Sequence, residues 1–218
     1  MHDVSLPAPD WHLHVVDDDA PFRRSLVFLL ESMGWQVTPH ASAADFLAAC
    51  PSPQDTFGCL LLDIRMPQMS GLELLRALVS RGWNPEEIPV IFLTGHGDVE
   101  LAVQAMKQGA FDFLENPFRD QHLLDVIGAA LRQRAAALHR GRRTRQAHDA
   151  LTRLSPRESE VARLVARGLP NRAIAQTLDI SEKTVHIHRQ RVMDKLDIGS
   201  AAELARIMFH ADPEALDD

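Results

Sequence analysis

Short apolar runs bounded by turn residues recur five times within the first 130 residues. Runs of this kind are typical of strands that are buried on both faces of a sheet. We expect strands at 13–17, 35–38, 59–63, 88–93 and 111–114. Helical periodicity fills the intervals, and we expect helices at 20–33, 42–49, 70–82, 98–108 and from 119 onward. The alternation predicts an α/β fold with a doubly wound, parallel, five-stranded sheet.

The second half of the chain has helical patterns only. The sequence Ser-Pro-Arg-Glu at 155–158 is a capping box with Pro at the first helical position, and Gly168 is placed to end that helix. We then expect a short helix at 172–178, a tight turn at 179–180, a helix at 182–196 capped by Ser181, and a last helix from a capping box at 200–203 to His210. Four short helices with a tight turn between the second and third predict a small all-α helix-turn-helix domain.

An Arg-rich stretch joins the two patterns. Gly141 interrupts its helical stripe, so the stretch is expected to be either an extended helix or a hinged linker. A solvated spacer and a dimer-contacting helix are both compatible with this composition. The expected organisation is a tail at 1–11, the α/β domain at 12–130, the Arg-rich segment at 131–150, the helix-turn-helix domain at 151–211 and an acidic tail at 212–218.

The net charge of −7 conceals a strong asymmetry. Residues 1–130 carry 7 Lys and Arg against 18 Asp and Glu, whereas residues 131–150 carry 6 Arg against a single Asp. Residues 151–211 carry 10 Lys and Arg against 7 Asp and Glu. An acidic front half and a basic back half indicate different partners, and the back half is the candidate for binding nucleic acid.

Composition sets the compartment we expect. No apolar run is long enough to cross a bilayer, and the acidic N-terminus has no signal-peptide pattern. Cys50 and Cys59 are the only cysteines and have no metal-ligand spacing around them. We therefore expect a cytoplasmic protein in a reducing compartment, without a disulfide framework and without a membrane partner.

Polar groups follow three of the predicted strands. Asp17 and Asp18 follow the first, Asp63 ends the third, and Thr94 follows the fourth. In a parallel sheet these positions meet at the carboxyl edge, where ligands bind. Mg²⁺ prefers oxygen ligands, so Asp17, Asp18 and Asp63 are candidate metal ligands. Asp63 is also the candidate nucleophile for a phosphoryl group, to which the Thr94 hydroxyl would donate a hydrogen bond.

Each acid taken alone has a simpler interpretation as a helix cap or a solvated loop charge. Asp19, which stands two residues before Pro21, has the signature of an N-cap and need not face the site. The coincidence of three acids and a hydroxyl at the ends of strands one, three and four favours a phosphoryl site.

Residues 12–130 resemble a two-component receiver domain, which has a flavodoxin-like fold. The motifs VVDDD, LLLDIRMPQMSGLELL, IFLTGHGD and FLENPF stand in the family's order and spacing, and the resemblance is nearest to FixJ-type regulators. It implies phosphoryl transfer from a sensor histidine kinase to Asp63 with Mg²⁺. It also implies a switch pair, Thr94 and Phe113, and a signalling surface over the fourth helix, fifth strand and fifth helix.

One residue departs from the receiver pattern. Receivers carry a lysine before the proline of the last loop, whereas this chain has Asn116 before Pro117. Asparagine donates a neutral hydrogen bond to a phosphoryl group but does not offset its charge. The sequence therefore predicts weakened phosphorylation coupling, or partial activity without phosphate, unless another cation such as Arg65 compensates. The family also suggests a cis bond at Asn116–Pro117.

Residues 152–210 resemble the LuxR/NarL/FixJ-type helix-turn-helix, with TVHIHRQRVMDKL again nearest to the FixJ type. The resemblance implies that the 172–178 helix is the scaffold and that the 182–196 helix enters the major groove. The side chains at Val185, His188, Val192 and Leu196 should pack inward. We expect base or phosphate contacts from Lys183, Thr184, His186, Ile187, Arg189, Gln190, Arg191 and Lys195. Metal binding by His186 and His188 is disfavoured, since no third ligand stands nearby.

Together these features predict a response regulator that acts as a transcription factor and is not an enzyme. Its expected partners are a histidine kinase, double-stranded promoter DNA, RNA polymerase and, on activation, a second copy of the chain. One alternative is an atypical receiver that only dimerises a DNA-binding regulator, which Asn116 motivates. Another is a phosphotransfer enzyme of the haloacid-dehalogenase type, which the position of Asp63 on the third strand disfavours.

Overall fold

A computed structural model describes residues 11–52, 58–85, 87–95 and 99–213. The chain forms two compact units, Met1–Leu138 and His139–Asp218, and each is described by itself. No helix in the described part of the chain is both long and apolar enough to cross a membrane.

The first unit is built on one parallel sheet with the strand order β2-β1-β3-β4-β5. The strands are β1 (His12–Val16), β2 (Gln36–His40), β3 (Leu60–Asp63), β4 (Val90–Thr94) and β5 (Asp112–Glu115). The helices between and after them are α1 (Ala20–Ser32), α2 (Ala43–Ala49), α3 (Gly71–Ser80), α4 (Val99–Lys107) and α5 (Asp120–Leu151). The predicted fold class is confirmed, and the element bounds differ from the expected ones by at most two residues.

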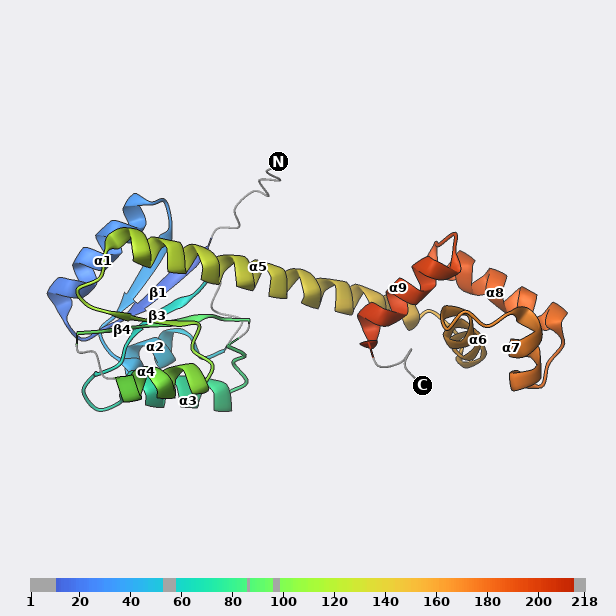
Figure 1. The fold of residues 1–218 in the computed structure, drawn as a ribbon, viewed down its shortest axis with the longest axis horizontal. Coiled ribbons are helices and arrows are strands. Elements are labelled where there is room, and N and C mark those ends of the chain that lie inside the picture. Colours follow the sequence, from blue (N-terminus) through green and yellow to red (C-terminus); the bar gives the residue numbers. More distant parts are fainter. Residues whose placement is uncertain (1–10, 53–57, 86, 96–98, 214–218) are drawn as a thin grey trace. The chain divides into compact units, whose positions relative to one another are not determined.

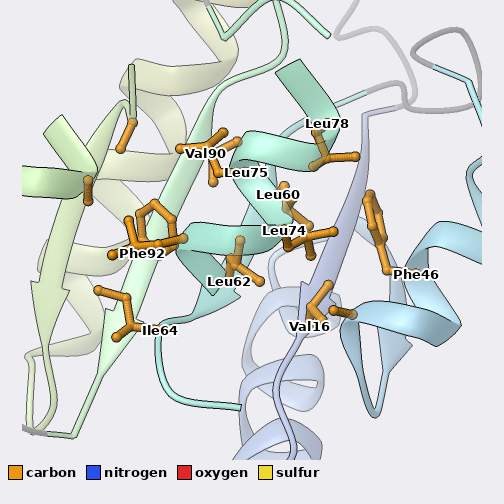
Figure 2. Close-up of a cluster of buried hydrophobic side chains, with 14 of the residues drawn as sticks. Val16, Phe46, Leu60, Leu62, Ile64, Leu74, Leu75, Leu78, Val90 and Phe92 are labelled. Atoms are coloured by element: carbon orange, nitrogen blue, oxygen red, sulfur yellow. The ribbon is translucent and has the colours of Figure 1, made fainter. Parts of the chain in front are cut away.

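Helices cover both faces of this sheet (Figure 1). One face packs against α2, α3 and α4 around a cluster that includes Phe46, Leu74 and Phe92 (Figure 2). The other packs against α1 and the first part of α5 through residues such as Leu30 and Ile127. Because β1, β3 and β4 are buried on both faces, their sequences are nearly continuous apolar runs.

Local sequence signals account for the ends of α1. The Asp19 side chain caps its N-terminus by accepting a hydrogen bond from the Phe22 N–H at 3.1 Å, and Pro21 occupies the first turn. Gly34 follows the helix with φ at +87°, a conformation that glycine adopts without strain. The predicted Asp19 cap is therefore confirmed, and the glycine accounts for the end of the helix. The strand-to-helix turn directly after β1 is fixed in this way.

Two buried histidines lie side by side on the edge of the sheet. The Nδ1 of His14 on β1 and the Nε2 of His40 on β2 are 3.0 Å apart, and each residue is only 5% exposed. Phe46 packs edge-on against both rings. Burial, together with the neighbouring histidines, lowers the pKa of His14 to about 4, so this imidazole is neutral at pH 7.

Helix α5 runs without a break from Asp120 to Leu151, through the boundary between the two units. Of the two alternatives left open for the Arg-rich stretch, the structure contains the extended helix, and Gly141 forms no hinge. A helical glycine costs only about 1 kcal/mol. The neighbouring Arg and Ala residues are strong helix formers and offset that cost.

The second unit contains the end of α5 and four further helices. These are α6 (Pro156–Ala166), α7 (Asn171–Leu178), α8 (Glu182–Leu196) and α9 (Ala201–Ala211). Val161, Ile174, Val185 and Leu204, one from each of these helices, are fully buried in a common core. The turn between α7 and α8 begins at Asp179, which has a left-handed conformation with φ at +53°.

The expected caps of this unit hold with one correction. Ser155 and Glu158 form the predicted reciprocal box at the start of α6, and Ser181 caps α8. Ser200 caps α9 through the Glu203 N–H, but the Glu203 carboxylate accepts from the Gly199 N–H at 3.0 Å. The predicted second capping box is therefore wrong in one of its two hydrogen bonds. The Glu203 carboxylate accepts from the N–H of Gly199 and not from the N–H of Ser200, the expected donor.

Candidate phosphoryl site and DNA-binding surface

The sheet brings the predicted polar groups to one edge. Asp17 directly follows β1, while Asp63 and Thr94 are the last residues of the neighbouring strands β3 and β4. All three, with Asp18 and Asn116, line one cavity of about 200 Å³. The cavity lies at the carboxyl ends of the strands, the place at which open α/β sheets bind ligands.

Asp17 is held tightly at the bottom of this site. It is 5% exposed, and its carboxylate accepts a hydrogen bond from the Asp19 N–H at 2.7 Å. The Arg23 guanidinium donates to its backbone carbonyl. Burial, reinforced by the charges of Asp63 and Asp18, raises the pKa of Asp17 to about 6.

Asp63 is half-buried at the mouth of β3. Burial and the charge of Asp18 raise its pKa, while hydrogen bonds from the Arg65 and Ile64 N–H groups and the Arg65 charge act in the opposite direction. Gly71, at the start of α3, lies so close to the Asp63 carbonyl that an added Cβ would stand 2.3 Å from that oxygen. Only glycine fits there, so the β3–α3 loop is fixed behind the acid.

The donor set fits a hard divalent cation. Asp17, Asp18, Asp19 and Asp63 supply carboxylate oxygens to one cavity, and such oxygens are what Mg²⁺ prefers. Within the described ranges, no three His, Cys, Asp or Glu side chains already surround a common point. Mg²⁺ commonly takes one or two protein carboxylates and completes its shell with water and phosphate, so three preassembled ligands are not required.

The remaining predicted residues of this site lie on β4, β5 and the loop that follows. Thr94 is 3% exposed, Asn116 is exposed, and the Asn116 N–H donates to the Thr94 carbonyl at 2.6 Å. Phe113 on β5 is half-buried against the core on the α4 side of the sheet. The peptide bond between Asn116 and Pro117 is cis, as expected.

Three further cavity residues were not predicted for this role. Phe22, Leu93 and Gly95 contribute apolar wall or backbone, and Asp19 both caps α1 and lines the cavity. A first-turn position such as that of Phe22 has no chemical signature in the sequence. Its place is set by the turn that the Asp19 cap fixes.

The side chains of helix α8 form a buried set and an exposed set, as predicted. Val185, Val192 and Leu196 are buried, and His188 is half-buried with its Nδ1 enclosed. The side chains of Lys183, His186, Ile187, Gln190 and Arg191 are exposed. His186 and Gln190 line a shallow groove with Asn171 at the start of α7. One helix thus presents a continuous polar face of a kind that fits the major groove.

Three of the predicted DNA-contacting side chains have partners within the unit. Arg189 donates to the Asn171 side chain at 2.8 Å, which ties α8 to the start of α7. The Thr184 hydroxyl lies 2.8 Å from that of Ser181, within the α8 cap. Lys195 donates to the Glu158 carboxylate at 2.6 Å. The contacts of Arg189 and Lys195 join residues 18 and 37 positions apart and have no signal in a single sequence, whereas the Thr184 contact is local to the cap.

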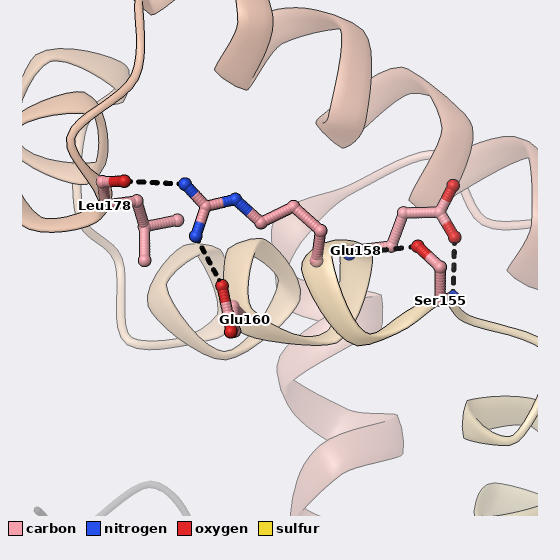
Figure 3. Close-up of polar contacts among 5 residues, drawn as sticks. Ser155, Glu158, Glu160 and Leu178 are labelled. Carbon is pink, nitrogen blue, oxygen red and sulfur yellow. Dashed lines mark hydrogen bonds and ion pairs between the residues drawn. The ribbon is translucent and has the colours of Figure 1, made fainter.

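The Glu158 carboxylate joins the start of α6 to the end of α8. It is 4% exposed and also accepts from the Ser155 N–H at 2.8 Å (Figure 3). The Lys195 hydrogen bond and the Ser155 N–H lower the pKa of Glu158 to about 2. On the same helix, Arg157 donates to the Leu178 carbonyl at the end of α7 and pairs with Glu160 (Figure 3).

Comparison with known proteins agrees with this geometry. The family described as the response regulator receiver domain matches residues 13–128, and the family of bacterial regulatory proteins of the luxR type matches residues 152–208. The chain belongs to the response regulator receiver family. It is a two-component response regulator with a receiver and a LuxR-type DNA-binding domain.

Relatives of this response regulator match along nearly the whole chain. The transcriptional regulatory protein FixJ of Bradyrhizobium diazoefficiens is 42% identical over 92% of this chain and 95% of its own. The C4-dicarboxylate transport transcriptional regulatory protein DctR of Rhodobacter capsulatus is 46% identical over 89% of this chain and 98% of its own. The structure of the response regulator StyR is 40% identical, covers 92% of this chain and 98% of its own, and has a TM-score of 0.78.

These findings confirm the predicted family and fold for both halves of the response regulator. They do not favour the alternative of a receiver that serves only as a dimerisation module. Receivers as a family use Mg²⁺, and the combination of domains implies a sensor kinase and DNA as partners. The family is one of transcription regulators.

Proposed function

We propose that Asp63 is the phosphoacceptor of this response regulator and that Asp17 and Asp18, together with Asp63, would hold Mg²⁺. In the proposed step, an Asp63 carboxylate oxygen forms a bond to phosphorus while the bond from phosphorus to the kinase imidazole nitrogen breaks. Mg²⁺, when bound, would supply positive charge to the phosphoryl oxygens. The protein is not itself an enzyme in this proposal.

The observation that carries this proposal is the shared cavity of Asp17, Asp18, Asp63 and Thr94. Its volume of about 200 Å³ has room for a phosphoryl group. The Thr94 hydroxyl would donate to a phosphoryl oxygen, and Phe113 would follow its movement as the second member of the switch. Asn116 would donate a neutral hydrogen bond in the same cavity.

A mass measurement tests the phosphoacceptor. Incubation with the phosphorylated kinase, or with a small acyl phosphate and Mg²⁺, should add one phosphoryl group to the wild-type chain and none to Asp63→Asn. Asp45→Asn, which removes an exposed acid on α2, is the matched control and should be modified normally. Equal modification of Asp63→Asn would refute the assignment.

We also propose that phosphorylation promotes dimerisation and that two copies of α8 bind the half-sites of a promoter, where they act on RNA polymerase. His186, Ile187 and Gln190 are the proposed base-reading residues, and Lys183 and Arg191 the proposed phosphate contacts. Support comes from their exposure on one helix and from the luxR-type match.

Gel shifts on DNA upstream of the target genes, with and without a phosphoryl analogue, test both domains together. Gln190→Ala combined with His186→Ala should weaken specific binding by about 1–3 kcal/mol for each lost base contact. Arg163→Ala, which removes an exposed cation from α6, is the matched control. Unchanged promoter binding by the double variant would contradict the groove assignment.

A further inference from the structure

A groove of about 470 Å³ lies in the second unit between the C-terminal part of α5 and α9. Arg143, Arg206 and His210 stand along it, and Ala147, Ala150 and Ile207 provide its apolar surface. None of the described residues that line it is acidic. The groove therefore combines an apolar floor with a cationic rim, and neither phosphotransfer nor the proposed base-reading face of α8 uses it.

The chain itself contains a segment of the complementary pattern. Residues 214–218, which lie outside the described residues, read Glu-Ala-Leu-Asp-Asp. This segment has three acids, no basic residue, and an apolar pair, Ala215 and Leu216, between the acids. The acids at the two ends of the segment complement the two arginines and the histidine of the groove in charge. The apolar centre of the segment complements the alanine and isoleucine surface of the groove.

Chain length allows this segment to reach the groove. Helix α9 ends at Ala211, and its last two turns carry Arg206, Ile207 and His210. The distance along the helix from Arg206 to Ala211 is about 8 Å. Five extended residues span at most about 17 Å, so a segment that starts after Pro213 can turn back along these two turns.

We propose that the acidic segment 214–218 docks in cis into the groove between α5 and α9. The Leu216 side chain lies on the floor of Ala147, Ala150 and Ile207, and the acids pair with Arg143 and Arg206. Docking in this way attaches the end of α5 to α9. The proposal does not depend on DNA binding or on phosphorylation of the receiver.

Disulfide trapping in the full-length chain tests the docking. Gln146 is an exposed residue of the groove, and the native Cys50 and Cys59 are buried. Under mild oxidation, the variant Gln146→Cys with Leu216→Cys should form a disulfide within one chain, at a rate independent of protein concentration. Thr177→Cys with Leu216→Cys, which places the first thiol on an exposed position of α7, is the control for random collision and should react at least tenfold more slowly.

Charge reversal distinguishes docking through ion pairs from a chance encounter of the acidic segment with the groove. Adding Arg143→Glu and Arg206→Glu to the trapping pair should slow the disulfide about three- to tenfold, as expected for two or three exposed ion pairs. Changing Glu214 and Asp217 to Lys in the same chain should restore the rate. Higher salt should slow trapping in the unreversed pair, because exposed pairs are screened.

Hydrogen exchange gives a second measurement without engineered thiols. Deleting residues 214–218 should raise amide exchange in 143–150 and 206–210, while the core helix α6 keeps its protection. Circular dichroism confirms that each variant keeps its helices. A disulfide that forms only between chains, a trapping rate equal to the Thr177 control or insensitive to both charge reversals, or unchanged exchange in the deletion overturns the proposal.

Discussion

Replacing Glu158 by Gln removes a buried negative charge from the start of α6 and keeps the shape of the side chain. In the wild type, Glu158 accepts from Lys195 at 2.6 Å and from the Ser155 N–H at 2.8 Å. Hydrogen bonds to charged groups contribute about 1.5–3 kcal/mol and neutral ones about 0.5–1.5 kcal/mol. The loss is therefore about 1 kcal/mol per bond. Because the Lys195 side chain is 41% exposed, solvent screening reduces the total to about 1–2 kcal/mol.

The chain offers a clean assay for this variant. All three tryptophans, Trp11, Trp35 and Trp83, lie in the first unit, so their fluorescence follows that unit alone. Circular dichroism follows the helices of both units. A loss of about 1–2 kcal/mol in a domain of this size lowers its melting temperature by about 4–16 °C. The dichroism transition of the second unit should move by this amount while the tryptophan transition stays in place.

Glu160→Gln is the matched control. Glu160 lies on the same helix and forms an ion pair with Arg157 at 2.6 Å, but both side chains are exposed and the pair is worth less than about 1 kcal/mol. If Glu158→Gln lowers the melting temperature of the second unit no more than Glu160→Gln does, the buried Glu158 carboxylate contributes no more stability than the exposed Glu160 carboxylate. If the tryptophan transition moves equally, the effect is not confined to the second unit. Either result would refute the reasoning.

The pH dependence of the same variant supplies an independent check. The pKa of Glu158 is lowered from 4.5 to about 2, so the unfolded chain binds the proton more readily than the folded one. The stabilisation is therefore complete above about pH 4.5 and is lost as the pH falls toward 2. Glu158→Gln should lack this part of the acid destabilisation. An identical acid profile in wild type and variant would show that the carboxylate is not the group that titrates.

Three further predictions concern the other features of the molecule. Asn116→Lys should strengthen phosphorylation-dependent dimerisation by adding a cation to the cavity, and an equal response of both chains to a phosphoryl analogue in light scattering would show the substitution to be neutral. The pKa of His14 is lowered from 6.5 to about 4, so the unfolded chain takes the proton first and His14 should contribute a loss of about 3 kcal/mol to the first unit as the pH falls from about 6.5 toward 4; because the raised pKa of Asp17 acts in the opposite direction over part of this range, the loss is read as the difference between wild type and His14→Phe in urea titrations followed by tryptophan fluorescence. Lys183→Ala should reduce the slope of log K against log salt for DNA binding by about 1, whereas Lys195→Ala, whose amine is bound to Glu158, should lower the stability of the second unit and leave the slope nearly unchanged.

Local signals in the sequence predicted much of this fold. The Asp19 cap, the box at Ser155 and the glycine stops each depend on residues within a few positions, and the structure contains them. The carboxyl-edge placement of Asp63 also followed from sequence, because parallel strands that alternate with helices end on the same side of the sheet. These features require no knowledge of distant contacts.

Features that depend on tertiary contacts were missed. The Glu158–Lys195 pair joins residues 37 positions apart, and the His14–His40 contact exists only because β2 lies beside β1. Gly141 left a hinge open as an alternative because a single glycine lowers helix propensity, but the strong helix formers on both sides outweigh it. The contact of Arg189 with Asn171, 18 positions apart, likewise has no signal in a single sequence.

The charge of the phosphoryl cavity depends on both kinds of information. Four acids line it, and among its described lining residues Arg65 is the one cation. Burial raises the pKa of both Asp17 and Asp63, so the surrounding protein disfavours their negatively charged forms. A phosphoryl group adds more of the same charge. In the proposed site, where residue 116 is asparagine and not lysine, the stabilisation of that group would fall to the cation, Thr94, backbone N–H groups and Arg65. The response of Asn116→Lys therefore measures how much of the phosphoryl charge those groups already compensate.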